Sequence, residues 1–308
     1  MKPIDPTRLC LLVTVYHPYR WVAPLTWKLL DRFWPDHPPL FFCGLTSEEA
    51  GDLPHIAWPD SALPRVWADF ALAAAKELQG RGFEACYFLL EDHPPLAPCH
   101  QHHLNQTLPR LLNELPASYI ALMGWDNRRF ATRGGPVAGP YRMMHLTARQ
   151  APRFHLHPSL FRMEALVACL ENLAASARPN PWGFEKLNDK PDAALPDEFK
   201  ANCHQIFGEE LALQKPSALQ HAARTVERQF FHRAMNLFPL FNKAGLGMTF
   251  WDALGFDDFF YDGPFPMFYS GVMARGRVSP AFLRYLERQP NPPPEFLEIA
   301  AAARRHAG

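Results

Sequence analysis

The stretch Ala85-Cys86-Tyr87-Phe88-Leu89-Leu90-Glu91-Asp92-His93, followed by Pro94-Pro95, decides the fold that we expect for this chain. Six apolar residues, a strand's length, lead into two adjacent carboxylates and an imidazole, and the prolines end the strand. A continuous apolar run predicts a strand covered on both faces, as in a parallel sheet. Ligands of open α/β sheets bind beyond the carboxyl ends of the strands, so Glu91 and Asp92 are candidates for chemistry. The alternative is that either acid only caps the following turn.

Strands and helices are expected to alternate on both sides of this stretch, over about the first 125 residues. The expected strands are 8–16, 40–44, 85–90 and 119–123, and the expected helices are 22–33, 66–79 and 104–115, the last kinked at Pro109. This alternation and the right-handed crossover rule favour an α/β fold with a mostly parallel sheet flanked by helices.

The pattern changes after Trp125. Residues 126–140 are rich in Arg and Gly, have no apolar period and predict a loop over the site. Further helices are expected at 159–173, with Ser159 as the N-cap, and at 195–213, 222–237 and 280–286. A proline-rich break follows at 290–294. The sequence therefore predicts a largely helical C-terminal extension over 191–308, packed on the same domain.

Composition and charge exclude several classes of protein. The 308 residues are 48% hydrophobic and 13% aromatic, which is enough for a globular core. The 31 basic and 31 acidic residues cancel, which argues against nucleic acid as a main partner. No apolar run approaches the roughly 20 residues of a membrane span, and residues 1–5 lack the apolar core of a secretion signal. We therefore expect a cytoplasmic protein with no transmembrane segment and leave peripheral membrane contact open.

Cysteine and histidine patterns do not predict a metal site. The six cysteines include no Cys-x-x-Cys pair and are expected to be reduced and mostly structural. Residues 99–103, Cys-His-Gln-His-His, suggest zinc by composition, but no second Cys/His pair lies at zinc-finger distance. Gly-x-Gly-x-x-Gly, the P-loop and the Gly-x-Ser-x-Gly elbow of serine hydrolases are also absent.

A second candidate acid, Glu185, ends the segment Asn180-Pro181-Trp182-Gly183-Phe184-Glu185. A carboxylate beside bulky rings is desolvated, which raises its pKa toward the range of a general base. The alternative is that Trp182 and Phe184 pack in the core and Glu185 caps the next segment.

Several short motifs in a fixed order carry a resemblance to a family. They are Tyr16-His17-Pro18-Tyr19, Trp67-Ala68-Asp69, Tyr87-Phe88-Leu89-Leu90-Glu91-Asp92, His157-Pro158-Ser159-Leu160-Phe161-Arg162 and Asn180-Pro181-Trp182-Gly183-Phe184-Glu185. The chain resembles bacterial glycosyltransferases of polysaccharide loci, which look like members of the GT-A fold. The resemblance runs from about residue 9 to 190, with a weaker echo at 267–277. It implies a nucleotide-sugar-binding GT-A-like domain over 1–190, followed by the extension over 191–308.

The resemblance also implies roles for individual residues. Glu91 and Asp92 match the acids that sit at the nucleotide diphosphate, commonly through a divalent metal, Mn²⁺ or Mg²⁺, of which they would be the ligands. Glu185 matches the general base that deprotonates the acceptor. Tyr16 and His17 match the place where the nucleotide base is met, and Asp69 is a further candidate for binding the donor. Glu91-Asp92-His93 departs from a strict Asp-x-Asp, which leaves metal dependence open.

The function expected from these residues is transfer of a sugar from a nucleotide-activated donor to a hydroxyl of a glycan or other acceptor, in surface polysaccharide or glycoconjugate synthesis. A base opposite the leaving group makes the expected outcome inverting. Arg128, Arg129 and Arg133 either fold over the pyrophosphate or remain solvated loop charges. The alternatives are a metal-dependent hydrolase that uses Asp92, His93 and the histidines of 100–103, and a non-catalytic carbohydrate- or nucleotide-binding protein of the same fold.

Overall fold

The apolar residues of two central strands, β1 (Leu9–Thr14) and β4 (Ala85–Leu90), alternate between the two faces of one sheet. Odd-numbered residues such as Leu11 and Tyr87 lie in one hydrophobic cluster, and even-numbered residues such as Leu12 and Phe88 lie in a second. Both faces are therefore buried, which explains why each strand is apolar at almost every position.

The computed structural model describes residues 1–59, 66–123, 137–138, 141–146, 156–184, 195–207, 209–212, 218, 259–268, 271–274 and 277–305. Among these residues no helix is long and apolar enough to cross a membrane.

The main sheet is mixed but mostly parallel. Its order is β3-β2-β1-β4-β8-β5-β9-β7-β6. The other strands are β2 (Leu40–Cys43), β3 (His55–Ile56), β5 (Tyr119–Ala121), β6 (Val137–Ala138), β7 (Tyr141–His145), β8 (Ser159–Arg162) and β9 (Cys203–Phe207). β8 lies antiparallel between β4 and β5, and β7 lies antiparallel between β9 and β6. The remaining strands all run in one direction.

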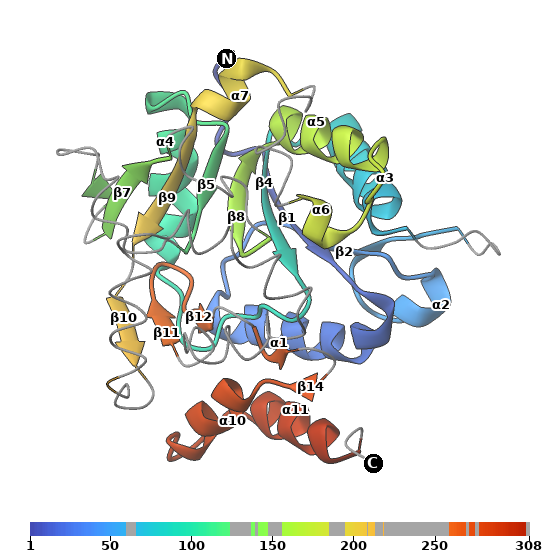
Figure 1. Cartoon of the computed structure of the whole chain (residues 1–308), viewed down its shortest axis with the longest axis vertical. Helices are drawn as coiled ribbons and strands as arrows, with labels where there is room; N and C mark the ends of the chain where they lie inside the picture. The colour runs from blue at the N-terminus through green and yellow to red at the C-terminus, as the bar shows by residue number, and fades with distance from the viewer. Residues whose placement is uncertain are drawn as a thin grey trace.

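Helices cover both faces of this sheet. On one face lie α1 (Ala23–Phe33), the short π-helix η2 (His103–Thr107) and α4 (Leu108–Glu114), and on the other lie α3 (Trp67–Gly80) and α5 (Met163–Ala174). Figure 1 shows α3 and α5 side by side, apart from α1 and α4. The predicted α/β fold with a mostly parallel sheet flanked by helices is confirmed. The kink expected at Pro109 is a π turn that ends just before it, and Pro109 stands in the first turn of α4.

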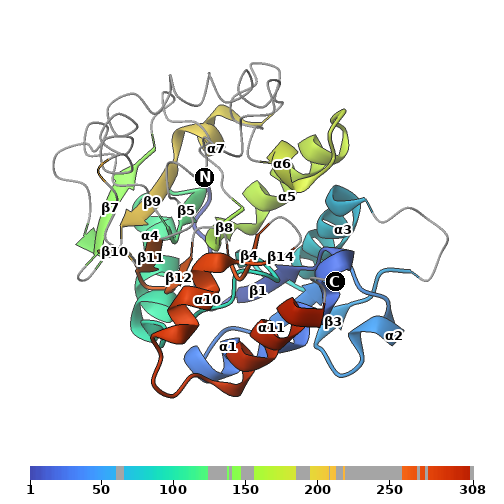
Figure 2. The ribbon, with the colours of Figure 1, turned by 60° about the horizontal axis from the view of Figure 1, so that its bottom comes forward.

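The C-terminal part of the described chain packs on α1. It contains the small strands β10 (Glu209–Ala212), β11 (Phe259–Asp262), β12 (Met267–Phe268), β13 (Met273–Ala274) and β14 (Arg277–Val278), and the helices α10 (Pro280–Glu287) and α11 (Pro294–Arg305). We call its apolar contact with α1 and the residues before it the C-terminal cluster, whose members include Val22, Leu25, Leu29, Leu96, Val272, Phe282, Phe296 and Ile299. Figure 2 shows α10 and α11 in front of the sheet, with α11 beside α1. The helix expected at 280–286 is confirmed as α10.

The helix expected at 159–173 begins four residues later than predicted. Ser159 is not its N-cap, because Ser159–Arg162 form β8 and α5 starts at Met163. Ser159 pairs instead with Phe88 of β4 and Ala121 of β5. Pairing with two strands outweighs the local helical spacing of the apolar residues, as tertiary context often does.

The helix expected at 195–213 is wrong for most of its length. Of its described residues only those of α7 (Asp197–Ala201) are helical, and β9 and β10 follow. β9 lies between β5 and β7 in the main sheet, so residues beyond 190 contribute to the same sheet as the N-terminal part. The division of the chain at residue 190 stays a prediction. The helix expected at 222–237 lies outside the described residues.

Candidate active site

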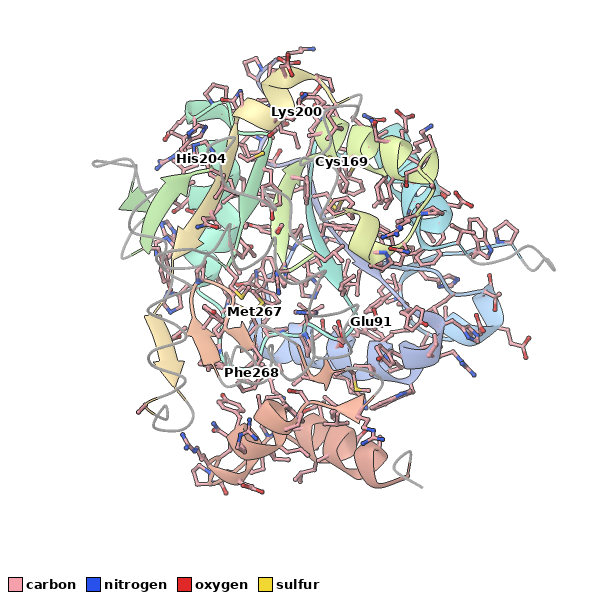
Figure 3. All side chains as sticks on the ribbon, viewed as in Figure 1. Glu91, Cys169, Lys200, His204, Met267 and Phe268 are labelled. Atoms are coloured by element: carbon pink, nitrogen blue, oxygen red, sulfur yellow. The ribbon has the colours of Figure 1, made fainter. Side chains whose placement is uncertain are left out.

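The carboxyl ends of β1 and β4 lie beside each other and bring the first candidate residues together. The two strands pair in parallel through Thr14 and Leu90, so the residues that follow each strand leave the sheet at the same edge. Glu91 continues this pairing, because its backbone N–H donates to the Thr14 carbonyl at 3.1 Å. Figure 3 labels Glu91 at this edge.

Glu91 is buried, with 2% of its surface exposed. Burial raises the pKa of its carboxyl well above the ordinary value, the nearby Asp92 charge adds to the rise, and hydrogen bonds from the backbone N–H groups of Glu91 and Tyr16 oppose it. The Thr26 hydroxyl of α1 donates to the Glu91 backbone carbonyl. Glu91 therefore connects the end of β1, the end of β4 and α1.

Asp92 is the more exposed acid of the pair, with 14% of its side chain accessible. Its Oδ1 accepts a hydrogen bond of 2.7 Å from Nδ1 of His93, which must be the donor because its partner is a carboxylate. The His93 ring meets the His157 ring edge to face, with centroids 5.4 Å apart. His157 precedes the antiparallel strand β8, which starts at the edge where β4 ends. The His157 imidazole thus stands beside the His93 imidazole, which donates to the Asp92 carboxylate.

The C-terminal part of the described chain packs against this edge. The Val272 N–H donates to the Asp92 carbonyl at 2.7 Å, and the Leu96 N–H donates to the Pro266 carbonyl at 2.9 Å. The loop after β4 is therefore hydrogen bonded to a segment that follows it by more than 160 residues.

Tyr16 and His17 stand at the same edge, after β1. Tyr16 is 52% exposed, which is unusual for a large ring in this protein, and its ring meets Tyr19 edge to face at 5.4 Å. His17 is half-exposed, and its Nε2 lies 3.0 Å from Oε1 of Glu49 in the short helix α2 (Ser47–Ala50). Tyr16 therefore offers an open ring face beside the acids, whereas His17 is engaged with α2.

Asp69 is exposed and lies in the first turn of α3. A carboxylate at that position interacts favourably with the helix dipole. Because α3 leads back to the start of β4, its N-terminus lies at the carboxyl edge of the sheet, the same edge as Glu91 and Asp92.

Glu185 lies outside the described residues, as do Arg128, Arg129 and Arg133. The residues just before Glu185 form the short helix α6 (Pro181–Phe184). Phe184 is fully buried against Trp67, Phe88 and Phe161, as the core interpretation of this ring predicted. A Cβ at Gly183 would stand 2.2 Å from the Arg178 carbonyl, so only glycine allows this turn to close.

The histidines after Cys99 form a cluster with Tyr141 rather than a ligand set. The Tyr141 hydroxyl is hydrogen bonded to Nδ1 of His100, and the His103 ring lies 5.4 Å from the Tyr141 ring. Cys99 itself is buried. Among the described residues, no three His, Cys, Asp or Glu side chains are grouped to hold a metal ion.

The residues at this edge could hold a divalent cation through the carboxylate of Asp92. Glu91 is buried and hydrogen bonded by backbone N–H groups, which leaves Asp92 as the carboxylate that reaches solvent. Mg²⁺ is commonly held by one or two carboxylates together with the phosphates of the substrate. Asp92 and a diphosphate would meet that requirement.

Sequence reasoning overlooked four residues of this edge. Thr26, His157, Gly271 and Val272 were given no role, although His157 and the segment 267–277 belong to the motifs that carry the family resemblance. Those motifs were the available signal. The contacts of these four residues with Glu91, Asp92 and His93 depend on long-range packing that local patterns do not report.

Comparison with known proteins gives little further identification. No protein-family model matches the chain, and no curated protein sequence does either. Among solved structures, mannose-1-phosphate geranyltransferase from Thermus thermophilus is similar at 16% sequence identity and a TM-score of 0.35, over 65% of this chain and 73% of that one.

Proposed function

We propose that this chain is a glycosyltransferase that moves a sugar from a nucleotide-activated donor to a hydroxyl acceptor. One observation carries the proposal: Asp92 and the exposed ring of Tyr16 follow two adjacent parallel strands at one edge of a mostly parallel sheet. That edge is where α/β sheets bind nucleotides. The arrangement is consistent with the GT-A-like fold that the sequence motifs imply.

Tyr16 would stack on the nucleotide base. Its ring is open to solvent, and a flat aromatic surface binds a base without requiring a particular sequence of donors and acceptors. Asp69 stays a candidate for the donor because it lies on an element that starts at the same edge. His17, through its contact with Glu49, would fix the turn that carries Tyr16.

Asp92 would face the diphosphate of the donor. A divalent ion, Mn²⁺ or Mg²⁺, held by Asp92 and the diphosphate would offset the negative charge that develops on the leaving nucleoside diphosphate. His93 orients the Asp92 carboxylate through their hydrogen bond. Glu91 lies in the core beneath Tyr16 and Asp92, and its carboxyl accepts from the Tyr16 backbone.

Glu185 would take the proton of the acceptor hydroxyl. It follows Phe184, which is anchored in a cluster of buried rings, so the described part of the turn is rigidly placed. A base on the side of the sugar opposite the diphosphate gives inversion at the anomeric carbon. Acceptors of this chemistry include the hydroxyls of surface polysaccharides and glycoconjugates.

The first test is thermal stabilisation of the protein by UDP, GDP, CDP, dTDP and their sugar conjugates, each with and without Mn²⁺. A ligand at 100 times its dissociation constant stabilises the folded state by about 2.7 kcal/mol, which is readily measured. A selective shift is the expected result. Stabilisation by none of these nucleotides contradicts the proposal, and release of inorganic phosphate without an acceptor would favour a hydrolase.

Replacing Asp92→Asn should remove most sugar transfer and any Mn²⁺-dependent part of the thermal shift, because the amide cannot supply the carboxylate charge. The expected loss of kcat/KM is at least a hundredfold, measured with the donor that the thermal panel selects. Asp31→Asn, at an exposed position of α1, is the control and should leave transfer unchanged. Full activity of the Asp92 variant would remove this residue from the site.

A further inference from the structure

The main chain at the two candidate acids is held from two sides. From α1, the Thr26 hydroxyl donates to the Glu91 carbonyl. From the C-terminal part of the chain, the Val272 N–H donates to the Asp92 carbonyl at 2.7 Å. The position of the Asp92 carboxylate is therefore set by elements on either side of the strand end, and one of them comes from far along the sequence.

Gly271 makes the second of these contacts sterically feasible. Its φ is +67°, and a Cβ there would stand 2.2 Å from the Asp92 carbonyl oxygen and 3.1 Å from Cε1 of His93. Both groups orient the Asp92 carboxylate. The carbonyl belongs to the backbone of Asp92 itself, and the His93 ring donates the 2.7 Å hydrogen bond to the carboxylate. Any side chain at position 271 must therefore displace the Asp92-His93 pair.

The segment around Gly271 is itself fixed in place. Pro264 and Pro266 accept hydrogen bonds from His100 and Leu96 of the loop after β4. Val272 is fully buried in the C-terminal cluster, and its carbonyl accepts from the Ser279 N–H at 2.8 Å, next to the start of α10. Because these contacts hold the segment in place, it cannot easily move away from a larger side chain at position 271. The strain then falls on Asp92 and His93.

We infer that Gly271 is a positioning residue for Asp92: by lacking a side chain it lets the C-terminal segment hold the carboxylate in the geometry that the donor diphosphate requires. This inference rests on the proposed function for the identity of the ligand. The residues around Gly271 then belong to the donor site, although Gly271 follows Asp92 by 179 positions in the sequence.

The test compares Gly271→Ala with Gly51→Ala. Gly51 also has a positive φ, +54°, but nothing lies within 4 Å of a Cβ at that position. Both variants place alanine at a positive φ, and only Gly271→Ala adds a collision with Asp92. The probe is whichever of UDP, GDP, CDP and dTDP stabilises the wild type most, titrated by calorimetry in the presence of Mn²⁺.

We expect Gly271→Ala to raise the dissociation constant of that nucleotide at least tenfold and Gly51→Ala to change it less than twofold. In turnover, Gly271→Ala should raise the KM for the donor while the KM for the acceptor stays constant, whereas a general loss of folded protein lowers only the apparent kcat. Equal nucleotide affinity of wild type and Gly271→Ala would overturn the inference and leave the proposed function standing.

A measurement on the wild-type protein covers the case in which Gly271→Ala does not fold. Hydrogen exchange of the peptide that contains Val272 should slow several-fold when the nucleotide is added, because the Val272 N–H bonds to Asp92 itself. Unchanged exchange in a protein that demonstrably binds the nucleotide would contradict the positioning role.

A third readout separates failure of the inference from failure of the proposed function. If no nucleotide binds the wild type, the proposed function fails. The NMR resonances of the His93 ring nitrogens, assigned with a His93→Gln variant, still report on the hydrogen bond between His93 and Asp92. A change in these resonances in Gly271→Ala but not in Gly51→Ala supports the positioning role. Identical His93 resonances in all three proteins overturn it.

Discussion

The ring of Tyr16 combines exposure with a fixed backbone. Its N–H is bound by the Glu91 carboxyl, so the main chain is held while the ring stays open to solvent. An aromatic side chain that is exposed but anchored loses little conformational entropy when it stacks on a ligand. This is the property expected of a residue that meets a nucleotide base.

Tyr16→Ala should weaken nucleoside diphosphate binding about tenfold, because stacking of a base on an aromatic ring contributes about 1–3 kcal/mol. Tyr16→Phe keeps the ring and should bind within about twofold of the wild type. Calorimetric titration of both variants checks the difference. If Tyr16→Ala binds as tightly as Tyr16→Phe, the ring does not contact the base.

The sequence identifies individual site residues where their role depends on neighbours in the sequence. Glu91 and Asp92 were identified because they follow an apolar strand directly, and that placement is what the structure has. Gly271 could not be identified in this way, since its reason for being glycine is the Asp92 carbonyl, which lies 2.2 Å from where its Cβ would be. The role of Glu185 stays a prediction.

The strand β8 shows what a single element can contribute through one buried charge. Arg162, at its end, is 1% exposed and donates to the backbone carbonyls of Ala117, Lys2 and Leu112 at 2.8, 2.7 and 2.6 Å. Burial lowers the pKa of this guanidinium. One side chain thus joins the N-terminal segment, the end of α4 and the start of β5.

Arg162→Met should lower the free energy of unfolding by about 3 kcal/mol, because it removes the donor from the buried carbonyls of Ala117 and Leu112. Arg110→Met is the control, since the Arg110 side chain is 65% exposed and pairs with Glu114 across one turn of α4, and its loss should cost less than about 1 kcal/mol. Denaturation by urea, analysed at constant m-value, measures both. Equal stabilities of the two variants would show that water replaces the guanidinium at low cost.

Elements were predictable where the local pattern and the long-range pairing agree. β1, β2, β4, α1 and α3 lie where the apolar patterns placed them. Residues 159–162 and 203–207 also fit helical spacing, but they complete a sheet whose other strands come from distant parts of the chain. The energy of that pairing is not visible in a local window of sequence.

Titration of a group far from the candidate site should affect the stability of the entire protein. His204 lies near the start of β9, and Figure 3 shows it at the opposite end of the sheet from Glu91. Burial, with a smaller effect of the His145 charge, lowers the pKa of His204 from 6.5 to about 4. The unfolded chain therefore binds a proton that the folded protein rejects between these two pH values.

The free energy of unfolding should consequently fall as the pH drops from about 6.5 to 4, with His204 accounting for up to about 3 kcal/mol. His204→Gln should flatten this part of the profile, whereas His102→Gln, at an exposed position, should reproduce the wild-type slope. Urea denaturation at several pH values gives the comparison. Parallel profiles for wild type and His204→Gln would mean that His204 does not carry the effect.

The hydrogen bond between Val272 and Asp92 has a consequence for how the protein is made on the ribosome. The nine strands of the main sheet all precede residue 208, yet the loop that bears Asp92 lacks the hydrogen bond from Val272 until residue 272 has left the exit tunnel. At roughly 5–20 residues per second, the 179 residues between Asp92 and Gly271 take on the order of 10–35 s to synthesise. A nascent chain can therefore hold the strands of the main sheet while Asp92 still lacks the hydrogen bond from Val272, so an activity that depends on Asp92 should begin only after residue 272 has left the exit tunnel.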